Sequence, residues 1–232
     1  MIRVRRSDER GHADHGWLDT YHTFSFASYR DPNHMGLSEL RVINQDRVQP
    51  GQGFGTHGHQ DMEILSYVLE GVLEHKDSMG TGSRILPGQV QFMSAGSGVT
   101  HSEYNGSDEE AVHFLQMWVL PAENGTEPRY DDKTVFERTD DTGYHLAASP
   151  DGREGSIRIG ADVSMYVGRL TAGDDVTHAS APGRRAWLHV ARGAIQVNDV
   201  ELEAGDGAAV TDETRLELRS PSSGEFVLFD LP

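Results

Sequence analysis

Short strand-like runs separated by tight turns constrain the fold of this chain most strongly. Apolar and β-branched residues alternate or cluster within each run, and turns rich in glycine, proline or asparagine separate the runs. Turns at intervals of roughly 8–12 residues are typical of a β-sandwich or β-barrel. Glycine makes up 26 of 232 residues, about 11% where ~7% is usual, as a chain with many turns requires. We therefore predict an all-β fold, with strands within 40–48, 62–71, 88–94, 112–120, 164–174, 185–210 and 215–220.

The order of these runs indicates a duplication. A strand that ends in YVLEG at Gly71 is followed by a turn and LPGQVQFM, and a strand that ends in HVARG at Gly193 is followed by EAGDGAAV. Between them, residues 121–155 are rich in charge and turn formers. We interpret this stretch as a surface connector with some short strands.

Charge and composition exclude several classes of function. The formal net charge is −17, which argues against direct binding of nucleic acid or of anionic membranes. Without cysteine, the chain has no disulfide, no thiolate catalysis and no cysteine-ligated metal. The N-terminal segment MIRVRRSDERGHADHG lacks the apolar run of a secretory signal, and no stretch approaches the ~18 apolar residues of a membrane span. We expect a cytoplasmic protein.

Two short motifs carry the strongest chemical signal. T-H-G-H at 56–59 and T-H-S-E at 100–103 each place two metal-ligating side chains at i and i+2, which lie on one face of a strand. Two such pairs on neighbouring strands would supply three nitrogens and one oxygen, a set that suits a divalent first-row metal. A lone H-x-H is more often a surface feature, and spacing alone leaves the metal site and the surface reading about equally supported. Nine of the twelve histidines lie at or before position 113.

A family resemblance adds to this reading. GQGFGTHGHQDMEILSYVLEG (51–71) and GQVQFMSAGSGVTHSEYN (88–105) are similar to the first and second motifs of the cupin superfamily. Three segments resemble pirin more closely: HTFSFASYRDPNHMG (22–36), MEILSYVLEGVLEHKDSMG (62–80) and AGSGVTHSEYN (95–105). The resemblance is close over most of 1–120 and weak over the remainder.

The resemblance implies a bicupin of two stacked jelly-roll β-barrels. It places a metal-binding barrel at 1–130 and a metal-free barrel at 131–232, with a C-terminal tail that can cross over to the first barrel. The implied ligands of one divalent metal are His57, His59, His101 and Glu103. Fe(II) is the expected ion, with Mn, Co, Ni, Cu and Zn as alternatives. Glu63 is a ligand in many cupins, but the pirin pattern favours a structural role for it.

The implied activity is that of a quercetin 2,3-dioxygenase, since bacterial pirins resemble such enzymes. It would open the ring of a flavonol-like substrate with O₂ and release carbon monoxide, with Glu103 as general base. The rival reading is a redox-sensitive regulator that binds a protein partner, and a third is another cupin chemistry. Two barrels can bury each other's strand edges, so we expect a monomer.

The remaining candidates have structural readings. We expect His75 and Asp77 to fix a turn, His22 to begin a TFSF strand and His113 to be a satisfied core histidine. We expect Met93, Met117 and Trp118 in the apolar core or, as the less favoured alternative, in the lining of a pocket. We expect Arg184 and Arg185 in a solvated loop.

Overall fold

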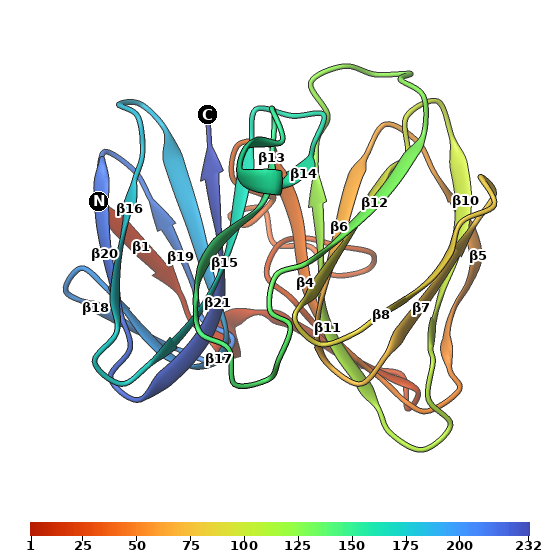
Figure 1. Ribbon diagram of the computed structural model, residues 1–232, viewed down its shortest axis with the longest axis horizontal. Helices are drawn as coiled ribbons and strands as arrows, with labels where there is room; N and C mark the ends of the chain where they lie inside the picture. The colour runs from red at the N-terminus through yellow and green to blue at the C-terminus, as the bar shows by residue number, and fades with distance from the viewer.

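The computed structural model describes all 232 residues, and its regular structure is almost entirely β. Figure 1 shows two β-rich halves side by side, with the N-terminal half of the chain mainly in one and the C-terminal half in the other. The two helical segments are single 3-10 turns, Ser7–Glu9 and Arg153–Gly155. No helix has the length and apolar character needed to span a membrane. The all-β prediction is confirmed.

The first half consists of two sheets. The larger has seven strands in the order β12-β9-β6-β11-β4-β3-β2, and the smaller has four in the order β5-β10-β7-β8. Side chains from both sheets, among them Val48, Leu73 and Phe114, form one buried cluster between them. The bounds in the larger sheet are β2 (Gly11–Asp14), β3 (Leu18–His22), β4 (Leu40–Val48), β6 (Glu63–Glu70), β9 (Gln89–Ser94), β11 (Val112–Val119) and β12 (Arg129–Thr134). Those in the smaller are β5 (Gly53–His59), β7 (Leu73–Asp77), β8 (Gly82–Ile85) and β10 (Val99–Asn105).

The second half is built on one ten-stranded sheet. Its main path runs β1-β19-β17-β21-β15-β13-β14, and β16, β18 and β20 branch from it through the long strand β17. The bounds are β1 (Ile2–Arg5), β13 (Gly143–Ser149), β14 (Ile157–Arg158), β15 (Ser164–Thr171), β16 (Asp175–Ala179), β17 (Arg185–Val197), β18 (Val200–Glu203), β19 (Gly207–Val210), β20 (Arg215–Arg219) and β21 (Ser223–Leu231).

The chain crosses between the halves at its N-terminus. Strand β1 pairs with β19 of the C-terminal sheet, and in Figure 1 it lies among strands from the far end of the chain. The C-terminal strand β21 does not join a sheet of the first half; it pairs with β15 and β17. Its contacts with the first half are made by side chains and by the chain end, since Tyr67 Oη donates to the Glu225 carboxylate and Ser38 Oγ donates to the Pro232 carbonyl oxygen. The expected boundary after residue 130 falls inside β12, which pairs with β9 of the first half.

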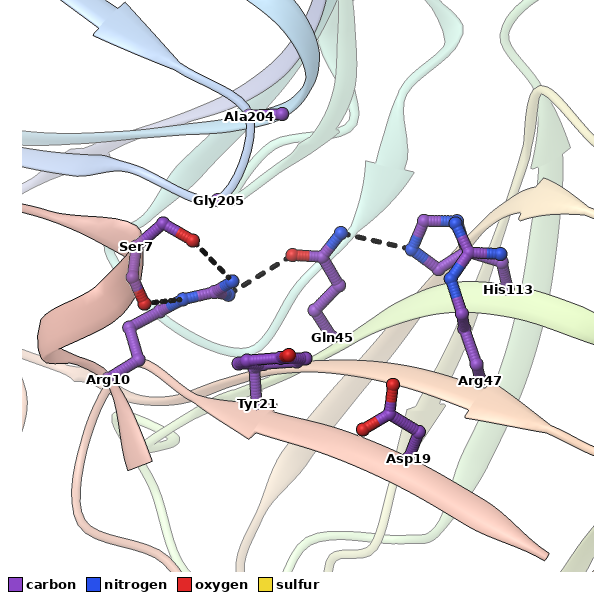
Figure 2. A pocket seen from close by; sticks show the side chains of 9 residues that line it. All are labelled: Ser7, Arg10, Asp19, Tyr21, Gln45, Arg47, His113, Ala204 and Gly205. Atoms are coloured by element: carbon purple, nitrogen blue, oxygen red, sulfur yellow. Dashed lines mark hydrogen bonds between the residues drawn. The ribbon is translucent and has the colours of Figure 1, made fainter. Parts of the chain in front are cut away.

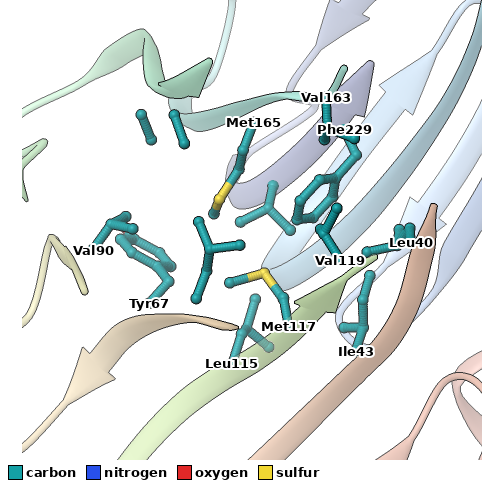
Figure 3. Packing of buried hydrophobic residues seen from close by; sticks show 14 of the residues in the cluster. Leu40, Ile43, Tyr67, Val90, Leu115, Met117, Val119, Val163, Met165 and Phe229 are labelled. Carbon is teal, nitrogen blue, oxygen red and sulfur yellow. The ribbon is translucent and has the colours of Figure 1, made fainter. Parts of the chain in front are cut away.

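The two halves share an apolar core. A cluster of 26 buried side chains draws on both, including Met117 and Val119 from β11 against Met165 and Phe229 from the other half (Figure 3). Because successive residues of a strand point to opposite faces, β11 places these side chains on one face of its sheet and Gln116 and Trp118 on the other. Burial of both faces explains the nearly continuous apolar run of this strand.

Most predicted strands are confirmed. The runs at 40–48, 62–71, 88–94, 112–120, 164–174 and 215–220 correspond to β4, β6, β9, β11, β15 and β20, and 185–210 contains β17 to β19. Gly71, which closes the first motif, has φ of +74°, and a Cβ there would lie 2.7 Å from the Ala111 carbonyl oxygen. Only glycine meets both conditions without strain.

Candidate metal centre

Two neighbouring antiparallel strands bring the predicted histidines together. In the β5–β10 ladder His101 lies directly opposite His57, and His59 lies two residues further along β5 on the same face. Ligand nitrogens of His57, His59 and His101 all lie within 4.8 Å of one another. The i, i+2 spacing thus converges in space as a metal site requires.

Hydrogen bonding fixes which ring nitrogens face the cluster. His57 Nδ1 donates to the Gly55 carbonyl oxygen at 2.8 Å, so the Nε2 of the neutral ring carries a lone pair. That Nε2 lies 3.1 Å from His101 Nε2. A proton on His101 Nε2 can bridge the two nitrogens as a hydrogen bond, and a cation bound by both would take the place of that proton. Two neighbouring ligand nitrogens that each lie about 2.1 Å from a shared ion are separated from one another by a distance close to that between these two Nε2 atoms.

Burial keeps the imidazoles of His59 and His101 neutral, and the neutral ring is the form that binds a metal ion. Burial lowers the pKa of His101 to about 3, with the neighbouring histidines as smaller causes. Burial and the charge of His57 lower the pKa of His59 to about 4. Both rings therefore present free lone pairs at neutral pH.

Glu103 lies beside the cluster, on the inward face of β10. Together with His101 and His75, its carboxylate forms a second potential ligand set. The set of three histidines does not include Glu103. Gln116 Nε2 donates to Glu103 Oε2 at 2.6 Å, and Ser66 Oγ donates to Oε1 at 3.3 Å. Burial raises the pKa of Glu103 to about 7, and no basic side chain forms a salt bridge with it. A bound cation would supply the missing positive charge, so these residues fit a divalent metal.

His75 is a positioning residue, and the expectation of a mere turn residue was incomplete. It is fully buried in β7, with Nδ1 3.5 Å from His101 Nδ1 and Nε2 3.1 Å from Asp77 Oδ2. Gln91 Nε2 donates to His75 Nδ1 at 3.1 Å, so that nitrogen is an acceptor and His101 Nδ1–H points to it. Asp77 does fix a turn, because its Oδ1 accepts the backbone N–H groups of Met79 and Thr81.

Replacing Asp77 with asparagine should lower metal affinity by up to about 10–100-fold, the usual cost of losing an outer partner of a ligating histidine. That partner is His75, which contacts His101 and whose tautomer Asp77 fixes. The amide keeps the turn but turns an N–H toward His75 Nε2, which favours the other tautomer and disrupts the contact with His101. The measurement is a competition titration against a metal chelator, with the exposed Asp131→Asn as control. Equal affinity in the two variants would contradict the role of Asp77.

Glu63 makes structural contacts at the boundary between the two halves. Its carboxylate accepts hydrogen bonds from Ser94 Oγ and from the backbone N–H of Gly160 at 2.9 Å, which joins the two halves of the chain. It belongs to neither group of converging ligand atoms. These contacts agree with the structural role expected for it.

Glu63→Ala should lower the free energy of unfolding by about 2 kcal/mol, because it leaves the buried Ser94 hydroxyl and the Gly160 N–H without their acceptor. Glu63→Gln retains an acceptor for Gly160 and should recover much of that loss. Chemical denaturation measures the stability, and metal analysis should give full occupancy in both variants. Loss of the metal from folded Glu63→Gln would instead assign Glu63 as a ligand.

A pocket of about 500 Å³ opens onto the site, and His57, His59 and Glu103 line it. Trp118 also lines this pocket, with its ring 4.9 Å from that of His59, which is the less favoured of the two places predicted for it. Met93 and Met117 are fully buried in the core as predicted. His22 ends β3 and does not begin a TFSF strand; it lines the pocket and contacts Asn44.

Sequence reasoning missed the polar wall of this pocket. Thr20 and Asp46 contribute to the wall, with the Thr20 hydroxyl donating to the buried Asp46 carboxyl, and burial raises the pKa of Asp46 to about 7. Alternation along β3 and β4 could have indicated that these residues share a face. It could not have shown that a cavity lies there.

Family comparison agrees with the site. Residues 3–119 match the family model described as pirin. The chain belongs to the pirin family. Residues 146–231 match a second model of the family, described as the quercetinase C-terminal cupin domain. The ligand-like histidines and Glu103 all fall within the first match.

Several relatives are similar along their whole length. The chain is 49% identical to quercetin 2,3-dioxygenase of Escherichia coli K12, covering 100% of this chain and 99% of the relative. It is 40% identical to a pirin-like protein of Caulobacter vibrioides, covering 99% of each chain. The crystal structure of bacterial pirin YhhW from Escherichia coli in complex with nickel(II) superimposes with a TM-score of 0.95, at 48% identity over 100% of this chain and 99% of that one.

The histidines of the second half differ in their surroundings, and the fully buried His189 has no hydrogen-bond partner. His178 contacts Tyr144 Oη at 3.0 Å and Asp230 Oδ2 at 3.0 Å. Arg184, expected in a solvated loop, instead forms ion pairs with Asp230 and Asp162. A metal-free second domain stays a prediction.

Proposed function

We propose that the chain is a metal-dependent dioxygenase that opens the flavonol ring of quercetin-like substrates with O₂ and releases carbon monoxide. One observation carries this proposal: converging neutral imidazoles and a buried carboxylate line an aromatic pocket of about 500 Å³. This volume lies within the range of small-molecule sites. The names of the relatives, quercetin 2,3-dioxygenase among them, support the same chemistry.

The proposed metal ligands are His57, His59, His101 and Glu103, around one divalent ion. Fe(II) is the proposed ion, although the same donor set suits Mn, Co, Ni, Cu or Zn, and the related structure from Escherichia coli is a nickel complex. The metal supplies a Lewis acid that favours the ionised form of the flavonol 3-hydroxyl.

The pocket walls provide the means to bind and orient a flat phenolic substrate. Phe26 and Trp118 pack edge to face at 5.3 Å, and Trp17 and Phe54 do the same at 5.3 Å. Such aromatic faces suit stacking against the rings of a flavonol. Asn44 and Asp46, which lie on β4 in the same sheet as Trp118, also line the pocket and offer hydrogen-bond partners to its hydroxyl groups.

Glu103 is the proposed general base. Burial raises the pKa of its carboxyl, so a carboxylate oxygen partly released from the metal can take the proton of the 3-hydroxyl and hold it. Ionisation makes the heterocycle electron-rich, and O₂ is reduced as both of its atoms enter the product. The carbon that bore the hydroxyl leaves with its oxygen as carbon monoxide, and the remaining carbons form a carboxylate ester.

The finer architecture belongs to the same proposal. We infer two stacked cupin barrels. The metal-binding barrel comprises 1–130, with its first strand paired in the sheet of the other half, and the metal-free barrel comprises 131–232. A cytoplasmic monomer is the proposed state, in which the shared core stabilises both halves without a second chain.

The test is a flavonol assay under air with the metal-free protein reloaded with each of the six metals. We expect oxygen-dependent loss of the quercetin absorbance band with stoichiometric carbon monoxide. Luteolin, which lacks the 3-hydroxyl, is the matched control and should not react. Quercetin left intact with every metal would contradict the proposal and favour a regulatory protein that binds a partner.

A further inference from the structure

A second cavity lies behind the wall of the metal pocket. Strands β3 and β4 alternate their side chains between the two spaces: Thr20 and Asp46 face the metal pocket, while Tyr21 and Gln45 face a separate cavity of about 180 Å³ (Figure 2). The second cavity is closed by the N-terminal segment on one side and by the turn before β19 on another. Its lining residues are Ser7, Arg10, Asp19, Tyr21, Gln45, Arg47, His113, Ala204 and Gly205.

Arg10 is the unusual feature of this cavity. Its side chain is nine-tenths buried, and all its hydrogen-bond acceptors are neutral. Nε donates to the Ser7 carbonyl oxygen at 3.3 Å, Nη2 to Ser7 Oγ at 3.3 Å, and Nη1 to Gln45 Oε1 at 3.1 Å. A guanidinium has five N–H donors, so two remain without a protein acceptor.

The nearby carboxylates are already engaged. Asp206 pairs with Arg6 at 2.6 Å and accepts the backbone N–H of Ser7, and Asp19 contacts His12 Nε2 at 2.7 Å. Arg10 forms a salt bridge with neither. The guanidinium also lies over the Tyr21 ring, 4.9 Å from its centroid, which compensates part of the cost of its burial. A buried charge without a counter-ion is still costly, and the two free donors of Arg10 are available to an anionic partner.

A second positive charge also lies in the lining. Arg47 lines the side opposite Arg10 (Figure 2), and its partner at 3.1 Å is Glu70. His113 is a neutral member of the lining: Gln45 Nε2 donates to its Nε2 at 3.0 Å, and its buried Nδ1 has no hydrogen-bond partner and lies 4.0 Å from Glu70 Oε2. Asp19 is the one carboxylate in the lining, and it opposes an anion.

We infer that this cavity between the two halves binds a small oxyanion of the carboxylate or phosphate type, held by the free N–H donors of Arg10. Its volume suits an inorganic anion or a short organic acid. The turn at Gly205 packs closely against Arg10, because a Cβ on Gly205 would lie 2.6 Å from Arg10 Nη2 and 2.4 Å from Ser7 Oγ. A bound anion would therefore join the N-terminal segment, the seven-stranded sheet and the C-terminal half.

The inference is independent of the proposed dioxygenase activity, and its test needs no turnover. Inorganic phosphate and acetate are titrated calorimetrically into the purified protein at constant ionic strength set with sodium chloride. We expect saturable 1:1 binding of at least one of them, weakened at least tenfold in Arg10→Gln and less in the more exposed Arg47→Gln. The matched control Arg84→Gln removes a comparable charge from an exposed ion pair with Glu74 and should bind as the parent does.

A crystal soaked in selenate locates the anion without any substitution. We expect an anomalous selenium peak within reach of Arg10 Nη1 or Nη2. Absence of saturable binding to the unaltered protein, equal binding by folded Arg10→Gln, or a cavity filled by water alone would each overturn the inference.

Discussion

Replacing His101 with alanine is expected to remove the bound metal and lower quercetin turnover by at least about a hundredfold. This bound is the upper end of what the loss of an outer partner of a metal ligand costs, and a direct ligand should cost at least as much. His101 is central because it alone belongs to both groups of converging ligand atoms. Its Nε2 faces His57, and its Nδ1 faces the buried His75.

Metal content by elemental analysis and O₂ consumption with quercetin measure the effect. The matched control is His145→Ala, which removes an exposed histidine of β13 in the other half and should leave both quantities unchanged. Circular dichroism verifies that each variant is folded. Full turnover in a metal-free His101→Ala protein would refute the metal-dependent mechanism.

The local sequence pattern was sufficient to predict the ligand-bearing motifs because the ligands of each motif lie close together in the sequence. An i, i+2 pair on a strand shares a face whatever the rest of the chain does, so His57 with His59 and His101 with Glu103 could be paired from spacing. That the two pairs meet depends on the pairing of β5 with β10, which spacing cannot specify. The resemblance to pirin, and not the periodicity, supplied that step.

The pocket could not be predicted because its walls come from strands far apart in the chain. Trp118 lies in an apolar run, and its neighbours Met117 and Val119 do belong to the core. Side chains of this run point to both faces of one sheet, so the composition of the run does not show which face lines a cavity. The ion pairs of Arg184 were missed for a related reason, since Asp230 lies 46 residues further along the chain.

The crossing of the N-terminal strand into the other half could not be predicted from the sequence either. Strand β1 is short and basic, and nothing in IRVR indicates that it pairs with β19, roughly 200 residues away. The crossing has a consequence for the molecule, because it carries Ser7 and Arg10 to the boundary between the halves, where the second cavity lies. The pirin motifs cover the metal site but say nothing of this region.

Replacing Glu103 with glutamine tests the proposed base separately from the ligand set. We expect kcat to fall by about 10²–10⁴-fold, the range attributed to a positioned acid or base, when turnover is compared at equal metal occupancy. The amide is nearly isosteric, since its oxygen can accept from Gln116 Nε2 while its N–H donates to Ser66 Oγ, but it cannot accept the proton. Metal affinity should fall as well, because a neutral oxygen replaces a charged one.

Substrate ionisation distinguishes these two effects. Raising the pH until the flavonol 3-hydroxyl ionises in solution removes the need for a base, so turnover by metal-loaded Glu103→Gln should recover toward that of the parent. His101→Ala should not recover, because its defect is the missing metal. Glu63→Gln, a second buried carboxylate changed in the same way, serves as control and should retain the parental rate. A Glu103→Gln protein that keeps its metal and the full rate at neutral pH would assign proton removal to another group, and Asp46, buried in the same pocket with a raised pKa, would then be the next to test.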